Sequence, residues 1–320
     1  MGNFGREASA ALVFLVLYVA IFSWMLWAYL TKRIKLASRY SILFFHVTIR
    51  VASQACGLVF GVQGWANPDV LLAFLILGAE GYFSLVICAF RFLISWHQHN
   101  LPSHESWLEP RQVDHTPNAR RKRVLKLIML GPFAIFFYWK QPMVVFHSVL
   151  VIANAAIIFG GSYLSGADFD HPETGDLQRR LNIAKITRTT GQSVFLACNF
   201  LLLFAILATI RERKRTGLRK IHPTLVLLTI AWFPLMIRGI FGILQSAVWS
   251  LSYYNRDNYD ETGFTSSFVT FEYALGVMTE WLACLLLILT YFTSSGDPSK
   301  GEIVRMEQKV QDDESAHFLR

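Results

Sequence analysis

Long blocks of apolar residues constrain this chain more than any other feature. An α-helix rises ~1.5 Å per residue, so about 20 residues cross a hydrocarbon core ~30 Å thick. The sequence is 53% hydrophobic and only 16% charged, which leaves too little polar surface for a soluble globular domain. We therefore predict an all-α polytopic membrane protein with transmembrane helices at about residues 8–30, 40–62, 70–94, 143–164, 190–210, 223–249 and 268–292.

The first block begins at Ala8 and is long enough to span the membrane by itself. No small-residue cleavage pattern follows a short apolar core, so we interpret this block as a retained span rather than a cleaved signal peptide. The four cysteines all fall inside predicted spans, where a thiol behaves as a small apolar side chain.

The basic residues orient the predicted bundle. Lys and Arg accumulate on the cytosolic side of membrane proteins, and 21 of the 30 basic residues fall in alternate loops and the tail from Thr293, against six in the other loops. This bias places the amino terminus outside or in a lumen and the carboxyl terminus in the cytosol. The net charge of +8 then serves membrane topology, and we expect no nucleic-acid partner. The protein is expected in the plasma membrane or an endomembrane.

An eighth apolar segment, Val124–Trp139, requires separate treatment. It is only ~24 Å long as a helix, carries Gly131-Pro132 in its middle, and would reverse the charge bias if it crossed the membrane. We predict a short interfacial or re-entrant helix before the fourth span, or alternatively a tilted approach to that span. Anionic inner-leaflet lipids are the expected partners of Arg120–Arg123 and Arg211–Lys220.

The domain organisation is simple. Residues 1–293 form one seven-span transmembrane domain, and residues 294–320 are an expected disordered cytosolic tail. The longest loop, Ser95–Arg123, contains four histidines without Cys partners, which we interpret as solvated loop residues rather than metal ligands. We expect no metal and no cofactor.

Charged residues inside the spans are the candidates for function, because an ionisable group near the bilayer centre costs at least ~2.5–3.5 kcal/mol unless it is paired or hydrated. Arg50 and Glu80 lie at similar depth on consecutive spans, which predicts an ion pair. Arg238 and Glu280 lie at similar depth on another two, with Glu272 further out as a second acceptor. These pairs either surround a ligand site or gate, or fix helix register as structural glue.

Further polar residues extend the candidate site. His46, Arg50 and Gln54 lie four residues apart on one face of the second predicted span, and Gln245 follows Arg238 by seven residues. A face with three such residues is not expected to contact lipid. The predicted ligand or gating residues are Arg50, Gln54, Glu80, Arg238, Gln245, Glu272 and Glu280.

The stretch Ile237-Arg238-Gly239-Ile240-Phe241-Gly242, followed in the next span by Glu272 and Glu280, resembles the Arg-then-Glu arrangement of fungal seven-helix proteins of the lipid-translocating-exporter-like family. The resemblance covers about 50 of the 320 residues. Gly242 and Gln245 replace the aromatic and acidic residues that this family carries after its Arg. The resemblance implies a poorly characterised fungal membrane protein.

Three function classes agree with these features. In order of preference they are a transporter or exporter of a small amphipathic solute or lipid, a seven-helix ligand-sensing receptor whose unknown cytosolic partner would contact Arg211–Lys220, and a structural or scaffolding membrane protein. A receptor predicts an outer pocket capped by Asp257, Tyr259 and Asp260. We do not expect an enzyme, because the spans hold only His46 and His147 and no Asp for an intramembrane zinc site.

Overall fold

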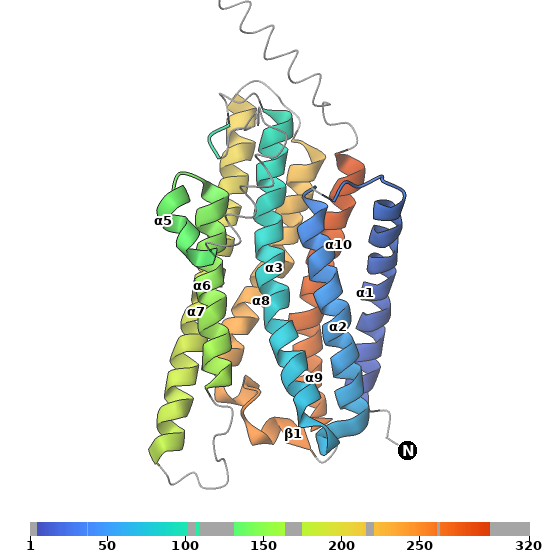
Figure 1. Cartoon of the computed structure of the whole chain (residues 1–320), viewed down its shortest axis with the longest axis vertical. Helices are drawn as coiled ribbons and strands as arrows, with labels where there is room; N and C mark the ends of the chain where they lie inside the picture. The colour runs from blue at the N-terminus through green and yellow to red at the C-terminus, as the bar shows by residue number, and fades with distance from the viewer. Residues whose placement is uncertain are drawn as a thin grey trace, which may run out of the picture.

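The helices run up and down side by side in one elongated bundle (Figure 1). The computed structural model describes residues 5–36, 38–101, 106–108, 131–163, 175–215, 221–260 and 263–294. Within these ranges seven helical segments are long and apolar enough to cross a membrane. This confirms the prediction of an all-α, seven-span integral membrane protein.

Six of these segments are regular α-helices, and the seventh changes its winding along its length. The regular helices are α1 (Arg6–Leu30), α2 (Tyr40–Gln63), α3 (Pro68–Asn100), α6 (Pro142–Ser162), α7 (Gly175–Arg215) and α8 (Pro223–Ala247). The seventh combines α9 (Ser266–Phe271), a π-helical stretch η5 (Glu272–Val277) and α10 (Met278–Thr293).

The bundle has two chemically distinct ends. At the hairpin end lie the start of α1, the 3₁₀ turn η1 (Gly64–Ala66), the short turns η3 (Trp249–Leu251) and η4 (Arg256–Asn258), and the two-residue strands β1 (Tyr259–Asp260) and β2 (Gly263–Phe264). β1 and β2 pair antiparallel. At the opposite basic end lie the α1–α2 connection with its four Lys and Arg residues, the end of α7 and the end of α10 (Figure 1).

The helix α3 is the central element, since it packs against α2, α6, α7, α8 and α10. Close approach elsewhere depends on small residues. A Cβ atom at Gly61 of α2 would lie 2.6 Å from the backbone nitrogen of Ala8, so glycine at this position lets α1 pack directly on α2. The start of α1 is also tied to the hairpin, because Glu7 accepts a hydrogen bond from the Phe264 amide at 3.4 Å.

Two helices extend well beyond their predicted spans. α3 continues past Ile94 to Asn100, just before the sequence Leu101-Pro102, where proline disfavours further helix. The prediction of a solvated loop was therefore wrong for His97, which lies on α3, is fully buried and bonds Thr209 at 2.8 Å. The histidines His104 and His115 lie outside the described residues.

The helix α7 begins at Gly175, 15 residues before the predicted Thr190. Hydropathy detects only the apolar part of a helix, whereas nothing between Asp176 and Thr190 breaks helical geometry. The basic residues predicted for a loop at this end therefore lie on a helix, among them Lys185 and Arg188.

The end of the segment Val124–Trp139 is a 3₁₀ turn η2 (Gly131–Phe133) followed by the five-residue helix α5 (Ala134–Tyr138). α5 packs beside α6 and is too short to cross a membrane (Figure 1). Its aromatic side chains Phe136 and Phe137 are about 70% exposed, as expected for a short helix at a lipid interface. Residues 124–130, the cluster Arg120–Arg123 and the tail 295–320 lie outside the described residues, as does part of Arg211–Lys220.

Candidate functional site

The centre of the bundle holds a cluster of three ionised side chains from three helices. Glu280 of α10 is fully buried and accepts hydrogen bonds from two guanidinium groups. Arg50 of α2 donates from Nη2 to Oε2, and Arg238 of α8 donates from Nε to Oε1 at 2.6 Å. Arg50 and Arg238 are only 3% and 6% exposed, so all three charged side chains are buried inside the bundle. We call these residues the central triad.

Glycine on α3 makes room for the central triad. A Cβ atom at Gly81 would collide with the Arg50 guanidinium and would lie 2.7 Å from Oε2 of Glu280. The next residue, Tyr82, packs its ring against Arg238 with the guanidinium carbon 5.4 Å from the ring centroid. Its hydroxyl donates to the carbonyl of Leu235 at 3.2 Å. The face of α3 that meets the triad is therefore shaped around the two arginines.

The predicted ion pairs are half correct. Arg238 pairs with Glu280 as expected, but Arg50 also pairs with Glu280, so the predicted pair of Arg50 with Glu80 is wrong. Glu80 instead accepts a hydrogen bond from Asn154 of α6 at 2.5 Å. Sequence position fixes the depth of each side chain, whereas the rotation of α2 turns Arg50 toward α10. Glu272 accepts from Gln245 at 2.7 Å rather than from Arg238.

The polar face of α2 points inward, as predicted. His46 and Gln54 are fully buried on either side of Arg50. Nδ1 of His46 lies 3.0 Å from both the Gly81 carbonyl and the Ser84 hydroxyl. Both polar atoms of the Gln54 side chain lack a hydrogen-bond partner among the described residues.

A cavity of about 100 Å³ lies beside the triad, on the side toward the hairpin end. Arg50 and Arg238 form part of its wall, together with Gln245 and Glu272 from the predicted set. Apolar side chains of α3 and α6 form the opposite wall. The remaining polar wall residues are Ser162, Arg188, Gln192, Tyr253 and Tyr254.

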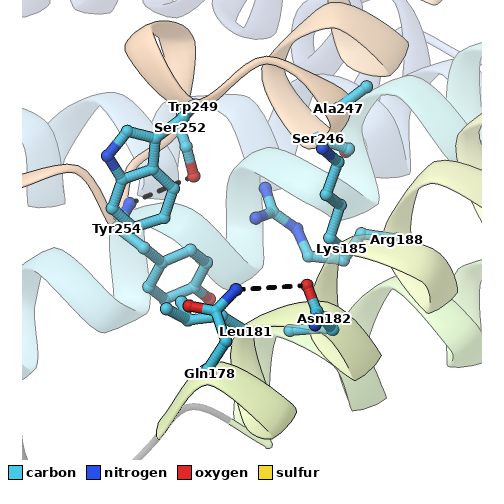
Figure 2. Close-up of a pocket in the computed structure, with 11 residues that line it drawn as sticks. Gln178, Leu181, Asn182, Lys185, Arg188, Ser246, Ala247, Trp249, Ser252 and Tyr254 are labelled. Atoms are coloured by element: carbon cyan, nitrogen blue, oxygen red, sulfur yellow. Dashed lines mark hydrogen bonds between the residues drawn. The ribbon is translucent and has the colours of Figure 1, made fainter. Parts of the chain in front are cut away.

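A second, larger cavity of about 300 Å³ lies nearer the hairpin end, between α7 and the segment that follows α8. Figure 2 shows Asn182 and Lys185 of α7 around the same space as Trp249 and Tyr254. Arg188 and Tyr254 line both cavities, with the Arg188 guanidinium carbon 5.1 Å from the centroid of the Tyr254 ring. These two side chains therefore form the partition between the outer cavity and the inner cavity.

The tyrosines at this partition are donors rather than anions at neutral pH. Burial raises the pKa of Tyr254, and the neighbouring Arg188 only partly offsets this effect. Burial and the adjacent Glu272 carboxylate raise the pKa of Tyr253. The hydroxyl of Tyr254 donates to the Gly161 carbonyl at 3.0 Å, which ties the loop after α8 to α6.

Arg188 and Gln192 were not predicted as site residues. Arg188 was assigned to a loop, and Gln192 was not distinguished from the apolar residues of its predicted span. A usable signal was present, because they lie four residues apart and so share one face of the helix that continues into the fifth span. Asp257, Tyr259 and Asp260, the predicted cap of an outer pocket, line neither of these two cavities, so that cap stays a prediction. Tyr259 packs on Trp65 and Phe264.

Among the described residues no group of three or more His, Cys, Asp or Glu side chains is arranged to hold a metal ion. Comparison of the chain with protein-family models, with curated proteins and with solved structures found no match. The seven-span fold and the geometry of the triad and its cavities are therefore the basis for a functional assignment.

Proposed function

We propose that this protein binds a small amphipathic solute or lipid through the two cavities and moves it across the membrane, with the central triad as the gate. The observation that carries the proposal is the position of Arg50 and Arg238. Each arginine bonds Glu280 on one side and lines the inner cavity on the other. A ligand in that cavity would therefore compete directly with Glu280 for the guanidinium groups.

The backbone near the triad supports movement. The π-helical stretch Glu272–Val277 comes immediately before the turn of α10 that carries Glu280, and π-helical turns inside α-helices are frequent at functional sites. Pro234 lies one turn before Arg238 within α8 and removes a backbone hydrogen bond from that helix. Two of the three helices that supply the gate, α8 and α10, thus have a locally weakened hydrogen-bond ladder in or beside them.

The orientation follows from the loop charges. We assign the basic end to the cytosol and the hairpin end to the exterior or to an organelle lumen, in the plasma membrane or an endomembrane. The outer cavity then faces away from the cytosol. The resemblance of residues around Arg238 to lipid-translocating-exporter-like proteins agrees with a lipid-like solute and a fungal source.

The test is movement of a labelled probe in proteoliposomes. Fluorescent single-chain amphiphiles with anionic, neutral and cationic headgroups are placed in one leaflet, and their appearance in the other is followed by chemical quenching. At least one probe should cross several-fold faster than in protein-free vesicles. The Glu280→Gln variant, which keeps the shape of the side chain but removes its charge, should lose this acceleration.

A ligand-sensing receptor is the second candidate, and the dense packing of the basic end favours it. In the described part of that end, helices are joined by neutral hydrogen bonds such as Tyr40 to Thr290 at 3.2 Å and Thr224 to Thr293 at 3.0 Å. If a probe binds but none crosses faster than in protein-free vesicles, the carrier proposal fails. Binding without movement is the result that a receptor predicts.

A further inference from the structure

We propose that the ligand is a single-chain amphiphile with one anionic headgroup, and that it reaches the inner cavity sideways from the bilayer between α3 and α6. Its headgroup binds at Arg188, Gln192 and Arg238, while its chain lies against the apolar wall and extends into lipid. The transport of this ligand rests on the proposed function, whereas its binding does not.

The charges around the inner cavity favour an anion. Three guanidinium groups line it, those of Arg50, Arg188 and Arg238, together with the carboxylate of Glu272. Glu280 adds a second carboxylate behind the wall, bonded to two of the arginines. The three positive and two negative charges leave one positive charge unbalanced, and Glu80 does not line the cavity. A single carboxylate or phosphate would balance it at a depth where unpaired charge is costly.

The arginines also have hydrogen-bonding capacity to spare. Nη1 of Arg238 and Nε of Arg50 are buried and have no hydrogen-bond acceptor among the described residues. Gly242 keeps the space beside Arg238 open, because a Cβ atom there would lie 3.2 Å from Nη1 and 2.5 Å from Oε1 of Gln192. A buried unpaired donor costs about 1–3 kcal/mol, and an oxyanion in the cavity would satisfy it.

The opposite wall of the same cavity is open to lipid. Leu72 and Ile76 of α3 line the cavity and are nevertheless 48% and 42% exposed. Ile157 and Ile158 of α6 complete this apolar wall. Because α3 and α6 are both long and apolar enough to span the membrane, we assign the exposed faces of Leu72 and Ile76 to the hydrocarbon. The cavity is therefore bounded by arginine on one side and reaches the bilayer on the other.

The size of the inner cavity agrees with this arrangement. A volume of about 100 Å³ corresponds to the share of roughly three water molecules in liquid water. It holds a carboxylate or phosphate headgroup but not a long acyl chain. The chain of a bound amphiphile must leave the cavity, and the gap beside Leu72 and Ile76 leads into a medium that dissolves it.

The ligand class is tested by photolabelling of the full-length protein in phosphatidylcholine nanodiscs. The probe is a 12-carbon carboxylate with a diazirine at the end of its chain. Unlabelled dodecanoate and dodecyl phosphate should both compete with it, and their relative potency distinguishes a carboxylate site from a phosphate site. Dodecyltrimethylammonium and inorganic phosphate should not compete. Equal competition by the cationic amphiphile overturns the headgroup assignment, and competition by inorganic phosphate overturns the requirement for a chain.

Two pairs of variants locate the ligand. Arg188→Gln should weaken probe binding at least tenfold, whereas Arg180→Gln, the same change two turns earlier on α7 outside both cavities, should leave it unchanged. Ile76→Trp should obstruct the lateral opening and slow labelling, whereas Ile186→Trp on the exposed face of α7 should not. Thermal unfolding of each variant verifies folding. Equal effects within either pair overturn the proposed site.

The results also separate this inference from the proposed function. Competition by both anionic amphiphiles without accelerated crossing of any probe would end the carrier proposal and leave the binding site standing. Accelerated crossing of the cationic probe alone would support a carrier and overturn the anionic ligand class.

Discussion

The two halves of α3 show how differently the two ends of this bundle are built. In the hairpin half, from Asp69 to Glu80, side chains such as Leu72 and Ile76 remain nearly half exposed and border the inner cavity. In the basic half, from Gly81 to Trp96, almost every side chain is buried. The largest fully buried side chains of the described chain include Trp96, Tyr82 and Phe92 from this half.

The same contrast appears in the polar contacts. In the basic half, neutral groups join the helices, as in the bond of 2.8 Å between His97 and Thr209. In the hairpin half, charged and amide groups surround space that they do not fill. The central triad lies where the two halves meet. A firmly packed half can hold Glu280 and its two arginines in place, while the looser half leaves one side of each arginine accessible.

The largest expected effect comes from changing the central triad, which lies where the two halves meet. Glu280→Ala leaves two buried guanidinium groups without their carboxylate, and removing one partner of a buried ion pair costs about 3–5 kcal/mol. We expect a loss of folded protein of this size in reversible unfolding by detergent titration. The matched control is Asp176→Ala, which breaks the exposed pair of Asp176 with Arg180 at 2.9 Å, a contact of the kind worth ~0–1 kcal/mol. Comparable losses in both variants would show that the triad does not support the fold.

The second prediction compares side-chain packing in the two halves of α3. Leu85→Ala in the basic half truncates a fully buried side chain and leaves a cavity, which should cost about 2–5 kcal/mol of unfolding free energy. Leu72→Ala in the hairpin half should cost well under half as much, because that side chain is already 48% exposed. Both variants are compared in the same detergent titration. Similar costs for the two changes would mean that the hairpin half is as tightly packed as the basic half.

The architecture was predictable from the sequence because hydropathy and loop charge each report on a one-dimensional property, the distance of a residue along the membrane normal. The prediction that Arg238 and Glu280 lie at similar depth was accordingly correct, since the two side chains pair. The partner of Arg50 was not predictable in the same way, since it depends on the rotation of α2 about its axis and on which of several helices it faces. Glu280 could satisfy both arginines only after three helices had packed together.

The extent of α7 was missed for a related reason. Its first turns are polar and basic, so hydropathy marks only the later, apolar part of the helix as a span. Arg188 was therefore assigned to a loop. The π-helical stretch Glu272–Val277 was not recognisable in the sequence, because its composition resembles that of the surrounding span. The inner cavity depends on Arg188, Gln192 and the loop tyrosines together, and no single segment of sequence contains that combination.

A smaller effect tests the contact between α3 and the triad. Gly81→Ala places a methyl group against the Arg50 guanidinium and Oε2 of Glu280, and overpacking of this kind costs about 1–3 kcal/mol. Gly78→Ala, three residues earlier on the same helix, meets only the Arg50 Nη1 atom at 4.0 Å. It should be neutral or slightly stabilising, since alanine favours helix over glycine. Unfolding titrations of the two variants separate the steric effect from helix propensity, and a stabilised Gly81→Ala protein would contradict the close packing of the triad on α3.

The smallest effect concerns the neutral bonds of the basic half. Thr209→Val keeps the shape of the side chain but removes the hydroxyl that bonds His97 Nε2, leaving a buried ring nitrogen unpaired at a cost of about 1–3 kcal/mol before relaxation. We expect the loss of unfolding free energy to lie near the lower end of this range, because the His97 ring can change tautomer and rotate toward other hydrogen-bonding groups. Thr48→Val is the control, since the exposed Thr48 hydroxyl bonds only the carbonyl of Phe44 on its own helix. If the Thr209 variant is as stable as this control, the basic half is held by apolar packing alone, and the difference between the halves reduces to how completely each one fills its interior.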